Sequence, residues 1–351
     1  MSDKKIENPS PLRLRLDSEA LVSNWQALDQ LSGAATAGAA IKANGYGLGA
    51  EPVSRLLQAA GCKDFYVANW QEASEIEAIL PTDVLVSVLN GVREEDMTYA
   101  VQSRAKPVLN SIEQFQRWQQ TGRVCDIMVN SGMNRLGINL DELKKIDVST
   151  LQVDIVMSHL ASADEDTKQN AEQLAQYQAA LTMITGRRKS LCNSAGIALG
   201  ADYHFDCTRP GLSLYGGIPR PVLAGKIKQV VFPETQILQC RSLQTGDKLG
   251  YNAKYVADRQ HDIAILAMGY ADGYLRGFSN RGYFLYQGHK LPVLGRVSMD
   301  LIAVDISQAS SLREGDWLSA EYELPIAAQQ SGLSQYELIT GLGHRYTRNW
   351  S

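Results

Sequence analysis

The alternation of short apolar runs with longer amphipathic stretches between residues 36 and 218 is the feature that most constrains the fold. The amphipathic stretches repeat apolar residues at three- and four-residue spacing, as helices do. Strands that alternate with helices pair in parallel, and eight such units within about 200 residues favour a closed (β/α)8 barrel of the TIM type over an open doubly wound sheet. The eight strand-like runs are AGAAIKA, DFYVAN, DVLVSVLNG, KPVLN, CDIMVNSG, QVDIVMSHLA, SLCNSAG and GLSLYGG.

The order of the predicted elements changes after residue 225, from alternating strands and helices to mainly strands. Strand-like runs such as HDIAILAMGY and MDLIAVDIS then follow one another, separated by glycine and aspartate turns. A chain of 351 residues is also long enough for two domains of about 150 residues each. We therefore predict a barrel over 11–225 and a mostly β domain over 226–351. The N-terminal segment 1–17, with its strand-like LRLRLD, pairs in this scheme with either domain, the second in particular.

The distribution of charge excludes several classes of partner. The net charge of −4 arises from 34 basic and 38 acidic residues that are well mixed along the chain. Nucleic-acid surfaces and polybasic membrane patches need clustered lysine and arginine, so we expect neither partner. The sequence contains no leader-like or membrane-length apolar segment, and its five cysteines form no C-x-x-C pair. We expect a reduced, cytoplasmic chain that acts on a small molecule and holds no metal.

The lysine in AAIKANGYGLGAE carries the first functional hypothesis. The working residues of such barrels lie where strands end, and Lys42 ends the first strand-like run just before a glycine-rich turn. An amine that is partly removed from water is less basic, and it becomes a nucleophile suited to Schiff-base chemistry. On residue type alone, a lysine that extends along an apolar surface into solvent is the commoner case.

Residues near the last two strand-like runs indicate a cofactor. Barrels often bind phosphate at this place with loop amides and a small hydroxyl. Asn193 and Ser194 in NSAG and the backbone amides of Gly211 and Leu212 in RPGL supply this chemistry, and Tyr46 in NGYGLG adds a phenol. A lysine and a phosphate cradle together suggest pyridoxal 5′-phosphate, because this cofactor carries an aldehyde and a phosphate.

The segment around Lys42 resembles the cofactor-lysine signature of the alanine racemase family. The resemblance covers roughly residues 11 to 350 and implies a pyridoxal-phosphate-dependent racemase of a small amino acid, with a cofactor-binding barrel and a β domain. It also implies a homodimer with shared active sites. The further matching motifs are NSGMNRLG, MSHLASADE, CNSAG, TRPGLSLYGG, GYNAKY, MGYADGYLR, LGRVSMD and YELITGLGHR, in the order of the family.

The resemblance assigns catalytic roles to five residues. Lys42 would hold the cofactor covalently and act as one base, while Tyr251 of the partner subunit would be the second base on the opposite face. His159 would lie close to this tyrosine, and Arg135 close to cofactor and substrate oxygens. Arg209 would face the pyridine nitrogen, where a permanent positive charge disfavours ring protonation. This arrangement favours racemisation over transamination and over the decarboxylation that related folds perform.

The same resemblance completes the list of binding residues. Met299 in VSMD would lie near the substrate carboxylate, and Tyr270 and Tyr274 are available to narrow the entrance. Tyrosines in a β segment more often serve packing, so the two tyrosines are the weaker assignments. The cofactor contacts would be Lys42, Tyr46, Asn193, Ser194, Arg209, Gly211, Leu212 and Trp350.

Several positions depart from the family pattern. Met128 stands where a lysine that orients the motif arginine is common, so Arg135 needs another means of positioning, and a bound anion such as chloride is one hypothesis. Asn130 replaces a frequent aspartate. Ser190 replaces a histidine that contacts the pyridine-facing arginine, and Trp350 replaces a frequent phosphate-binding tyrosine.

The leading hypothesis is an alanine racemase that supplies D-alanine for peptidoglycan. Because of the departures, a racemase of the same fold that acts on serine or on basic amino acids such as lysine and arginine stays open. A barrel that binds pyridoxal phosphate without catalysis is less favoured, because such proteins lack the β domain and its Tyr251. A barrel without any cofactor is the remaining alternative.

Overall fold

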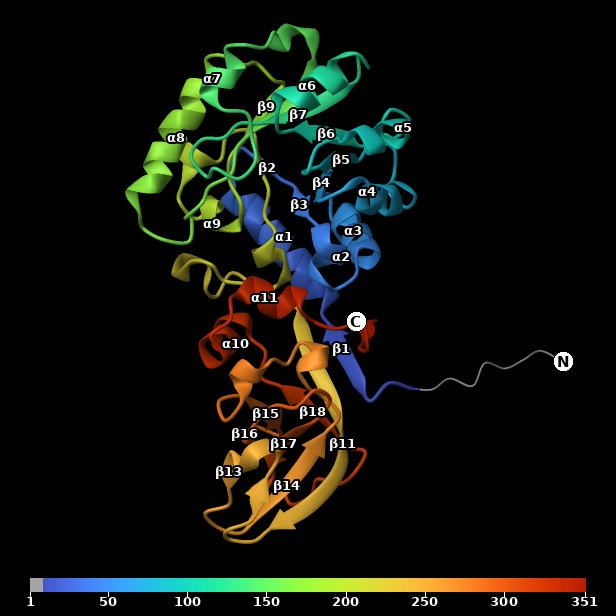
Figure 1. The fold of residues 1–351 in the computed structure, drawn as a ribbon, viewed down its shortest axis with the longest axis vertical. Coiled ribbons are helices and arrows are strands. Elements are labelled where there is room, and N and C mark those ends of the chain that lie inside the picture. Colours follow the sequence, from blue (N-terminus) through green and yellow to red (C-terminus); the bar gives the residue numbers. More distant parts are fainter. Residues whose placement is uncertain (1–8) are drawn as a thin grey trace, which may run out of the picture. The chain divides into compact units, whose positions relative to one another are not determined.

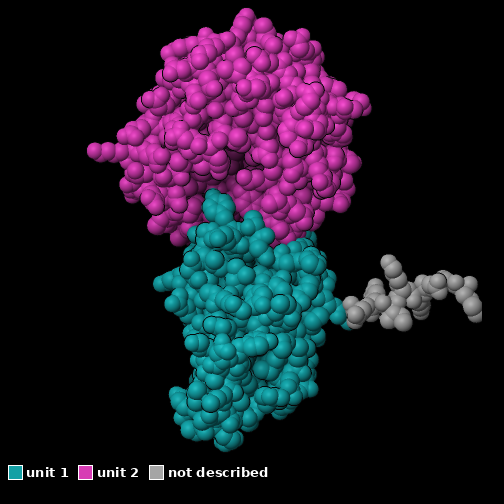
Figure 2. Space-filling view, viewed as in Figure 1, with its two compact units in different colours: residues 1–18, 229–351 teal, residues 19–228 magenta. Residues whose placement is uncertain are grey.

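The computed structural model describes residues 9–351 and divides them into two units (Figures 1 and 2). The first, residues 19–228, contains alternating strands and helices and is called the barrel unit here. The second, residues 9–18 with 229–351, is mostly β structure and is called the β unit. None of the helices within the described residues has the length and apolar composition needed to cross a membrane.

Parallel strands form a closed ring in the barrel unit. Seven of them pair in the order β3-β4-β5-β6-β7-β8-β9, and the short β2 and β10 pair with each other. The ring closes through the amides of Asp206 and Arg209, which donate to the carbonyls of Lys189 (3.1 Å) and Cys192 (2.8 Å). The strands are β2 (Thr36–Ala37), β3 (Ala39–Ala40), β4 (Asp64–Val67), β5 (Leu85–Val88), β6 (Lys106–Leu109), β7 (Val124–Met128), β8 (Gln152–Met157), β9 (Arg188–Ser190) and β10 (Cys207–Thr208).

Helices follow most strands and surround the ring (Figure 1). In a typical example, the Ser111 side chain caps α6 by accepting a hydrogen bond from the Gln114 amide, and the helix buries Phe115 and Trp118. The helices are α1 (Ser18–Leu31), α2 (Lys42–Tyr46), α3 (Ala50–Ala59), α4 (Trp70–Glu77), α5 (Met97–Ala100), α6 (Ile112–Gln119), α7 (Leu140–Leu143), α8 (Lys168–Leu181) and α9 (Ser194–Ile197).

The last predicted strand, GLSLYGG, is not a strand. Residues Leu212–Tyr215 form the 3-10 turn η4, and the two-residue strand β10 precedes it in the chain. All four residues of the turn are buried. The run therefore lacks the alternation of polar and apolar residues by which a half-buried strand can be distinguished from a buried turn. The expected eighth position in the ring is therefore occupied, but by an earlier segment.

The β unit contains a sheet that closes on itself. The long strand β11 (Val231–Leu243) pairs with β14 as well as with β18, which joins the two ends of the order β14-β17-β16-β15-β18-β11. The other elements are β12 (Lys248–Leu249), β13 (Tyr255–Val256), β14 (His261–Leu266), β15 (Tyr283–Tyr286), β16 (His289–Leu294), β17 (Ile302–Asp305), β18 (Trp317–Ala320), β19 (Thr347–Trp350), α10 (Leu324–Ser331) and α11 (Gln335–Thr340).

The N-terminal strand β1 (Leu12–Leu16) belongs to the β unit. It runs antiparallel to β11 and parallel to β19, the last strand of the chain. The leucines of its LRLRL sequence are buried, whereas Arg13 and Arg15 lie on the other face beside Glu234. Alternating leucine and arginine thus gives this strand one apolar and one charged face.

Candidate active site at the carboxyl ends of the barrel strands

Lys42 begins a turn with an unusual backbone. The next four residues have positive φ angles, which are 54° for Ala43, 54° for Asn44, 61° for Gly45 and 55° for Tyr46. Such a left-handed turn costs about 1–2 kcal/mol for each residue with a side chain, and strain of this kind is typical of functional sites. The Asn44 side chain offsets part of this cost by accepting a hydrogen bond from the Ala50 amide at 2.8 Å.

The amine of Lys42 lies in surroundings that make it less basic. Loss of hydration is the main cause that lowers the pKa of Lys42 from its usual value, repulsion by Arg135 adds to it, and Glu72 acts in the opposite direction. The Glu72 carboxylate accepts hydrogen bonds from the amides of Ala43 (2.8 Å) and Ala68 (2.7 Å), so it also holds the turn after the lysine. Sequence reasoning missed Glu72, whose signal is its place three residues after the helix cap Asn69.

Arg209 is buried at the end of β10, and its side chain is held by neutral groups. Its guanidinium donates to the Ser190 hydroxyl and to the carbonyl of Ser158. The Ser190 hydroxyl in turn donates to the Cys207 carbonyl at 2.7 Å. No ion pair within residues 9–351 neutralises Arg209, so its positive charge remains available to a ligand.

His159 follows β8 and is surrounded by cations. Loss of hydration and repulsion by Arg209, Arg135 and Lys42 together lower the pKa of His159 to about 3. The imidazole is therefore neutral at physiological pH, while the guanidinium groups of Arg209 and Arg135 carry positive charge beside it. A cluster with this charge distribution attracts carboxylate or phosphate groups.

Ser194 and η4 form a small polar cradle beside the lysine turn. The Ser194 hydroxyl oxygen accepts hydrogen bonds from the amides of Gly211 (3.0 Å) and Ser213 (3.2 Å). A Cβ atom at Gly211 would lie 2.3 Å from the Tyr46 hydroxyl, so these two residues are in close contact. The Ser213 hydroxyl is buried and has no hydrogen-bond partner within the described chain. Sequence reasoning missed Ser213, although it directly follows the predicted Leu212.

Asn193 and Leu212 support the cradle from within the protein. The Asn193 side chain caps α9 by accepting a hydrogen bond from the Gly196 amide at 2.9 Å, so it holds the segment that carries Ser194. Leu212 is the buried first residue of η4, next to the cradle. The barrel unit thus brings Lys42 together with the residues that the sequence analysis placed near phosphate.

The remaining predicted site residues belong to the β unit. Tyr251 lies in the 3-10 turn Tyr251–Ala253 with 68% of its surface exposed, and Met299 is 53% exposed. Trp350 ends β19, and its buried indole N–H has no partner within residues 9–351. Tyr270 is half-buried, whereas Tyr274 is only 1% exposed and stacks on a neighbouring phenylalanine, so the packing role fits Tyr274.

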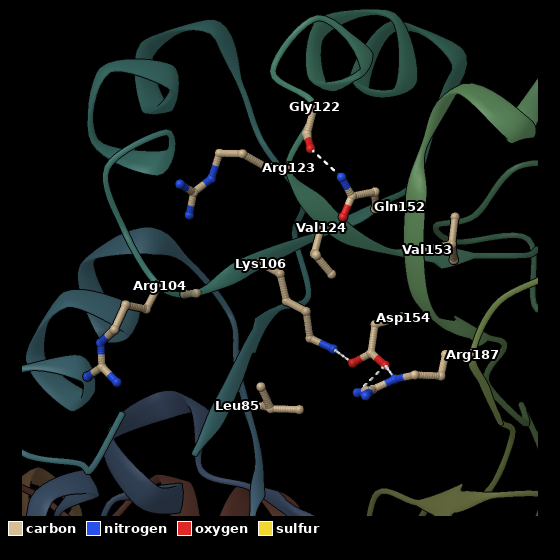
Figure 3. A pocket seen from close by; sticks show the side chains of 11 residues that line it. Leu85, Arg104, Lys106, Gly122, Arg123, Val124, Gln152, Val153, Asp154 and Arg187 are labelled. Carbon is tan, nitrogen blue, oxygen red and sulfur yellow. Dashed lines mark hydrogen bonds and ion pairs between the residues drawn. The ribbon is translucent and has the colours of Figure 1, made fainter. Parts of the chain in front are cut away.

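A pocket of about 660 Å³ lies at the opposite end of the barrel, where strands β6 to β8 begin (Figure 3). Lys106 donates to Asp126 at 2.8 Å and also pairs with Asp154, which Arg187 contacts from the other side at 2.8 Å. These charges compensate one another. The pocket is remote from Lys42, and the ion pairs of Lys106 link β6 to β7 and β8.

Comparison with known proteins places this geometry in a family. Residues 16–219 match the family described as "Alanine racemase, N-terminal domain", and residues 230–350 match "Alanine racemase, C-terminal domain". The chain belongs to the alanine racemase family. Its fold class, a (β/α)8 barrel followed by a mostly β domain, was predicted from the sequence and is confirmed.

Individual alanine racemases are similar over nearly their full length. The protein of Rhodospirillum rubrum is 39% identical, and the match covers 98% of this chain and 97% of that protein. A catabolic alanine racemase of Agrobacterium fabrum is 37% identical over 96% of this chain and 91% of its own, and the biosynthetic enzyme of that organism is 36% identical over 97% and 94%. The solved alanine racemase of Bartonella henselae, with covalently bound pyridoxal phosphate, has a TM-score of 0.92 at 33% identity and covers 98% of this chain and 100% of its own.

Proposed function

We propose that this protein is a pyridoxal-phosphate-dependent alanine racemase, which interconverts L-alanine and D-alanine. The observation that carries the proposal is the partly desolvated amine of Lys42, whose pKa is lowered, in the same strand-end cluster as Arg209, which has no ion-pair partner among the described residues. Membership of the alanine racemase family and relatives of up to 39% identity among those compared support the same activity.

The cluster fits pyridoxal phosphate. Lys42 has the amine that would bind the aldehyde, and the cradle of Ser194 and the amides of Gly211 and Leu212 would face the phosphate beside Tyr46. The buried and unpartnered hydroxyl of Ser213 next to this cradle is expected where a ligand supplies the missing hydrogen bond. Asn193 completes the proposed contacts within the barrel unit through the cap of α9, and the assignment of Trp350 rests on the family resemblance. When bound, the cofactor withdraws electrons from the substrate and so makes its α-proton removable.

Racemisation then needs two bases on opposite faces, because the proton must leave one face and return to the other. We assign one face to the amine of Lys42 and the other to the phenol of Tyr251 of the partner subunit. The high exposure of Tyr251 within its own unit suits a residue that completes the site of a second subunit. The proposal therefore includes a homodimer, with a barrel that holds the cofactor and a β unit that supplies the second base.

Arg209, Arg135 and His159 have separate tasks in this proposal. Arg209 would keep the pyridine nitrogen unprotonated, since a fixed guanidinium repels a second positive charge there. Arg135 would bind the substrate carboxylate and cofactor oxygens, and Met299 of the β unit is assigned to the substrate on the family resemblance. His159 would accept or donate hydrogen bonds as a neutral imidazole, because its pKa is lowered to about 3.

The physiological role is part of the same proposal. The product D-alanine would supply peptidoglycan synthesis in the cytoplasm, a location with which the five free cysteines are compatible. Use of the enzyme in alanine catabolism is the alternative, since the catabolic and biosynthetic relatives from Agrobacterium fabrum are 37% and 36% identical. A substrate other than alanine, namely serine or a basic amino acid, is the second alternative because of the changes at Met128, Ser190 and Trp350.

One series of measurements tests the proposal. We expect the purified protein to show the visible absorption band of lysine-bound pyridoxal phosphate and to exchange the α-proton of alanine for deuterium while it racemises. The variant Lys42→Ala should lose the band and at least 1,000-fold of the activity, because it removes both the attachment point and one base. A band that persists in this variant contradicts the role of Lys42. Exchange with serine or lysine but not with alanine identifies the alternative substrate.

A further inference from the structure

We propose that Asn130 is the positioning residue for Arg135, in a chain that lacks the lysine common two residues before Asn130. The inference rests on the proposed function, because it concerns the arginine assigned to substrate and cofactor oxygens. Relatives of this type commonly have a lysine where this chain has the buried Met128, so Arg135 must be oriented by another residue.

The Asn130 side chain uses its full hydrogen-bonding capacity inside one loop. Its oxygen accepts hydrogen bonds from the amides of Gly132 (3.1 Å) and Asn134 (3.0 Å). Its NH2 group donates to the side-chain oxygens of Asn134 (3.0 Å) and Asn139 (2.8 Å). An asparagine side chain has two donors and one carbonyl acceptor with two lone pairs, so no further bond is needed. The loop from 130 to 139 is thus tied to a single residue at its start.

The backbone of this loop is closed at its base and tightly turned at its tip. The amide of Asn130 donates to the Ile138 carbonyl at 3.0 Å, and the amide of Ile138 donates to the Met128 carbonyl at 2.9 Å. Asn134, which directly precedes Arg135, has a φ angle of 56°. Asparagine adopts this left-handed conformation more readily than most residues, and here both the amide and the side chain of Asn134 are also bonded to Asn130.

The direction of Arg135 depends on this backbone. The Arg135 side chain is exposed and forms no hydrogen bond or ion pair within the described residues, although its charge acts on Lys42 and His159. Without a partner of its own, the guanidinium is placed by the course of the chain on either side of it. Asn130 fixes that course immediately before Arg135 and again at Asn139, so its effect on the reaction passes through Arg135.

The first experiment measures the loop in the cofactor-free protein by hydrogen exchange of the peptide 129–140. We expect Asn130→Ala to speed exchange of this peptide by about tenfold, because the amides of Gly132 and Asn134 lose their acceptor. The conservative variant Asn130→Asp keeps both acceptor bonds and should stay within about threefold of the wild type. Gln120→Ala, which removes an exposed amide side chain after α6, is the matched control and should leave the peptide unchanged. Wild-type exchange in Asn130→Ala overturns the proposal.

The second experiment measures racemisation in a double-mutant cycle with Arg135→Gln. We expect Asn130→Ala to raise the KM for alanine about tenfold with a smaller fall in kcat, and to have less than a twofold effect once Arg135 is replaced. An equal effect in both backgrounds overturns the assignment to Arg135. A wild-type protein that does not racemise any amino acid refutes the proposed function instead, and the exchange measurement still decides the role of Asn130 in the loop.

Discussion

Replacing Gly211 with alanine is expected to damage the phosphate cradle by a calculable amount. The new Cβ atom would lie 2.3 Å from the Tyr46 hydroxyl oxygen, 2.9 Å from the ring carbon that carries it and 3.3 Å from the Cβ atom of Ala40. Tyr46 has little room to retreat, because it is buried and stacks on Tyr215 with ring centroids 4.7 Å apart. Overpacking of this kind costs about 1–3 kcal/mol.

Two assays measure this cost separately. For a unit of about 200 residues, about 2 kcal/mol lowers the melting temperature by about 4–8 °C, which circular dichroism of the cofactor-free protein detects. Displacement of the Tyr46 hydroxyl should also weaken pyridoxal phosphate binding by up to about tenfold, measured by titration of the visible band. An unchanged melting temperature together with unchanged cofactor affinity in Gly211→Ala would refute the geometry of the cradle.

A second substitution separates the clash from other effects of the alanine. Tyr46→Phe removes the atom that lies 2.3 Å from the new Cβ, but it leaves the ring carbon at 2.9 Å. The double variant should therefore recover part of the melting temperature lost in Gly211→Ala, while cofactor affinity stays low because the phenol is gone. Strictly additive losses of stability would place the cause elsewhere in the loop.

Two further predictions concern the second base and the opposite end of the barrel. Tyr251→Phe should slow proton removal from one alanine enantiomer by at least 100-fold more than from the other, as measured by deuterium exchange of each enantiomer; equal slowing of both contradicts a one-sided role. Lys106→Met should lower the free energy of unfolding by about 3 kcal/mol in urea titrations, because Asp126 and Asp154 lose a buried cation. Lys63→Met is its control, since Lys63 pairs with Asp83 at an exposed site and should have little effect.

The barrel could be predicted from the sequence because its strands and helices have different apolar periods. The strand that closes the ring, β10, could not be predicted, because two residues are too few to show a period. The apolar run directly after it, GLSLYGG, resembles a buried strand and was therefore predicted as the strand instead. The same limit applies to β1, where alternation of leucine and arginine predicts a strand with one buried face but does not identify its partners.

Much of the candidate site followed from where strands end. Lys42 and His159 were predicted at the ends of separate strands, whereas Arg209 was expected just before the last strand; in the structure it follows β10 instead. The charges of the three residues meet because parallel strands in a ring end on the same side. The left-handed turn from 43 to 46 was not predictable, because Ala43 and Tyr46 have no intrinsic preference for positive φ and adopt it through contacts made elsewhere. Glu72 was missed for a related reason, since it acts on the turn after Lys42 from α4, which follows the next strand of the ring.

The closure of the barrel between its first and last strands has a consequence for biogenesis. Lys42 follows the first strand of the ring, whereas Arg209 and Gly211 follow the last, so the residues that would hold the two ends of the cofactor are made at opposite ends of the unit's synthesis. A nascent chain that has not yet emerged as far as β10 has the lysine but no completed cradle. A ligand that binds only the completed barrel stabilises it. Cofactor binding would therefore stabilise complete, folded chains but not truncated ones.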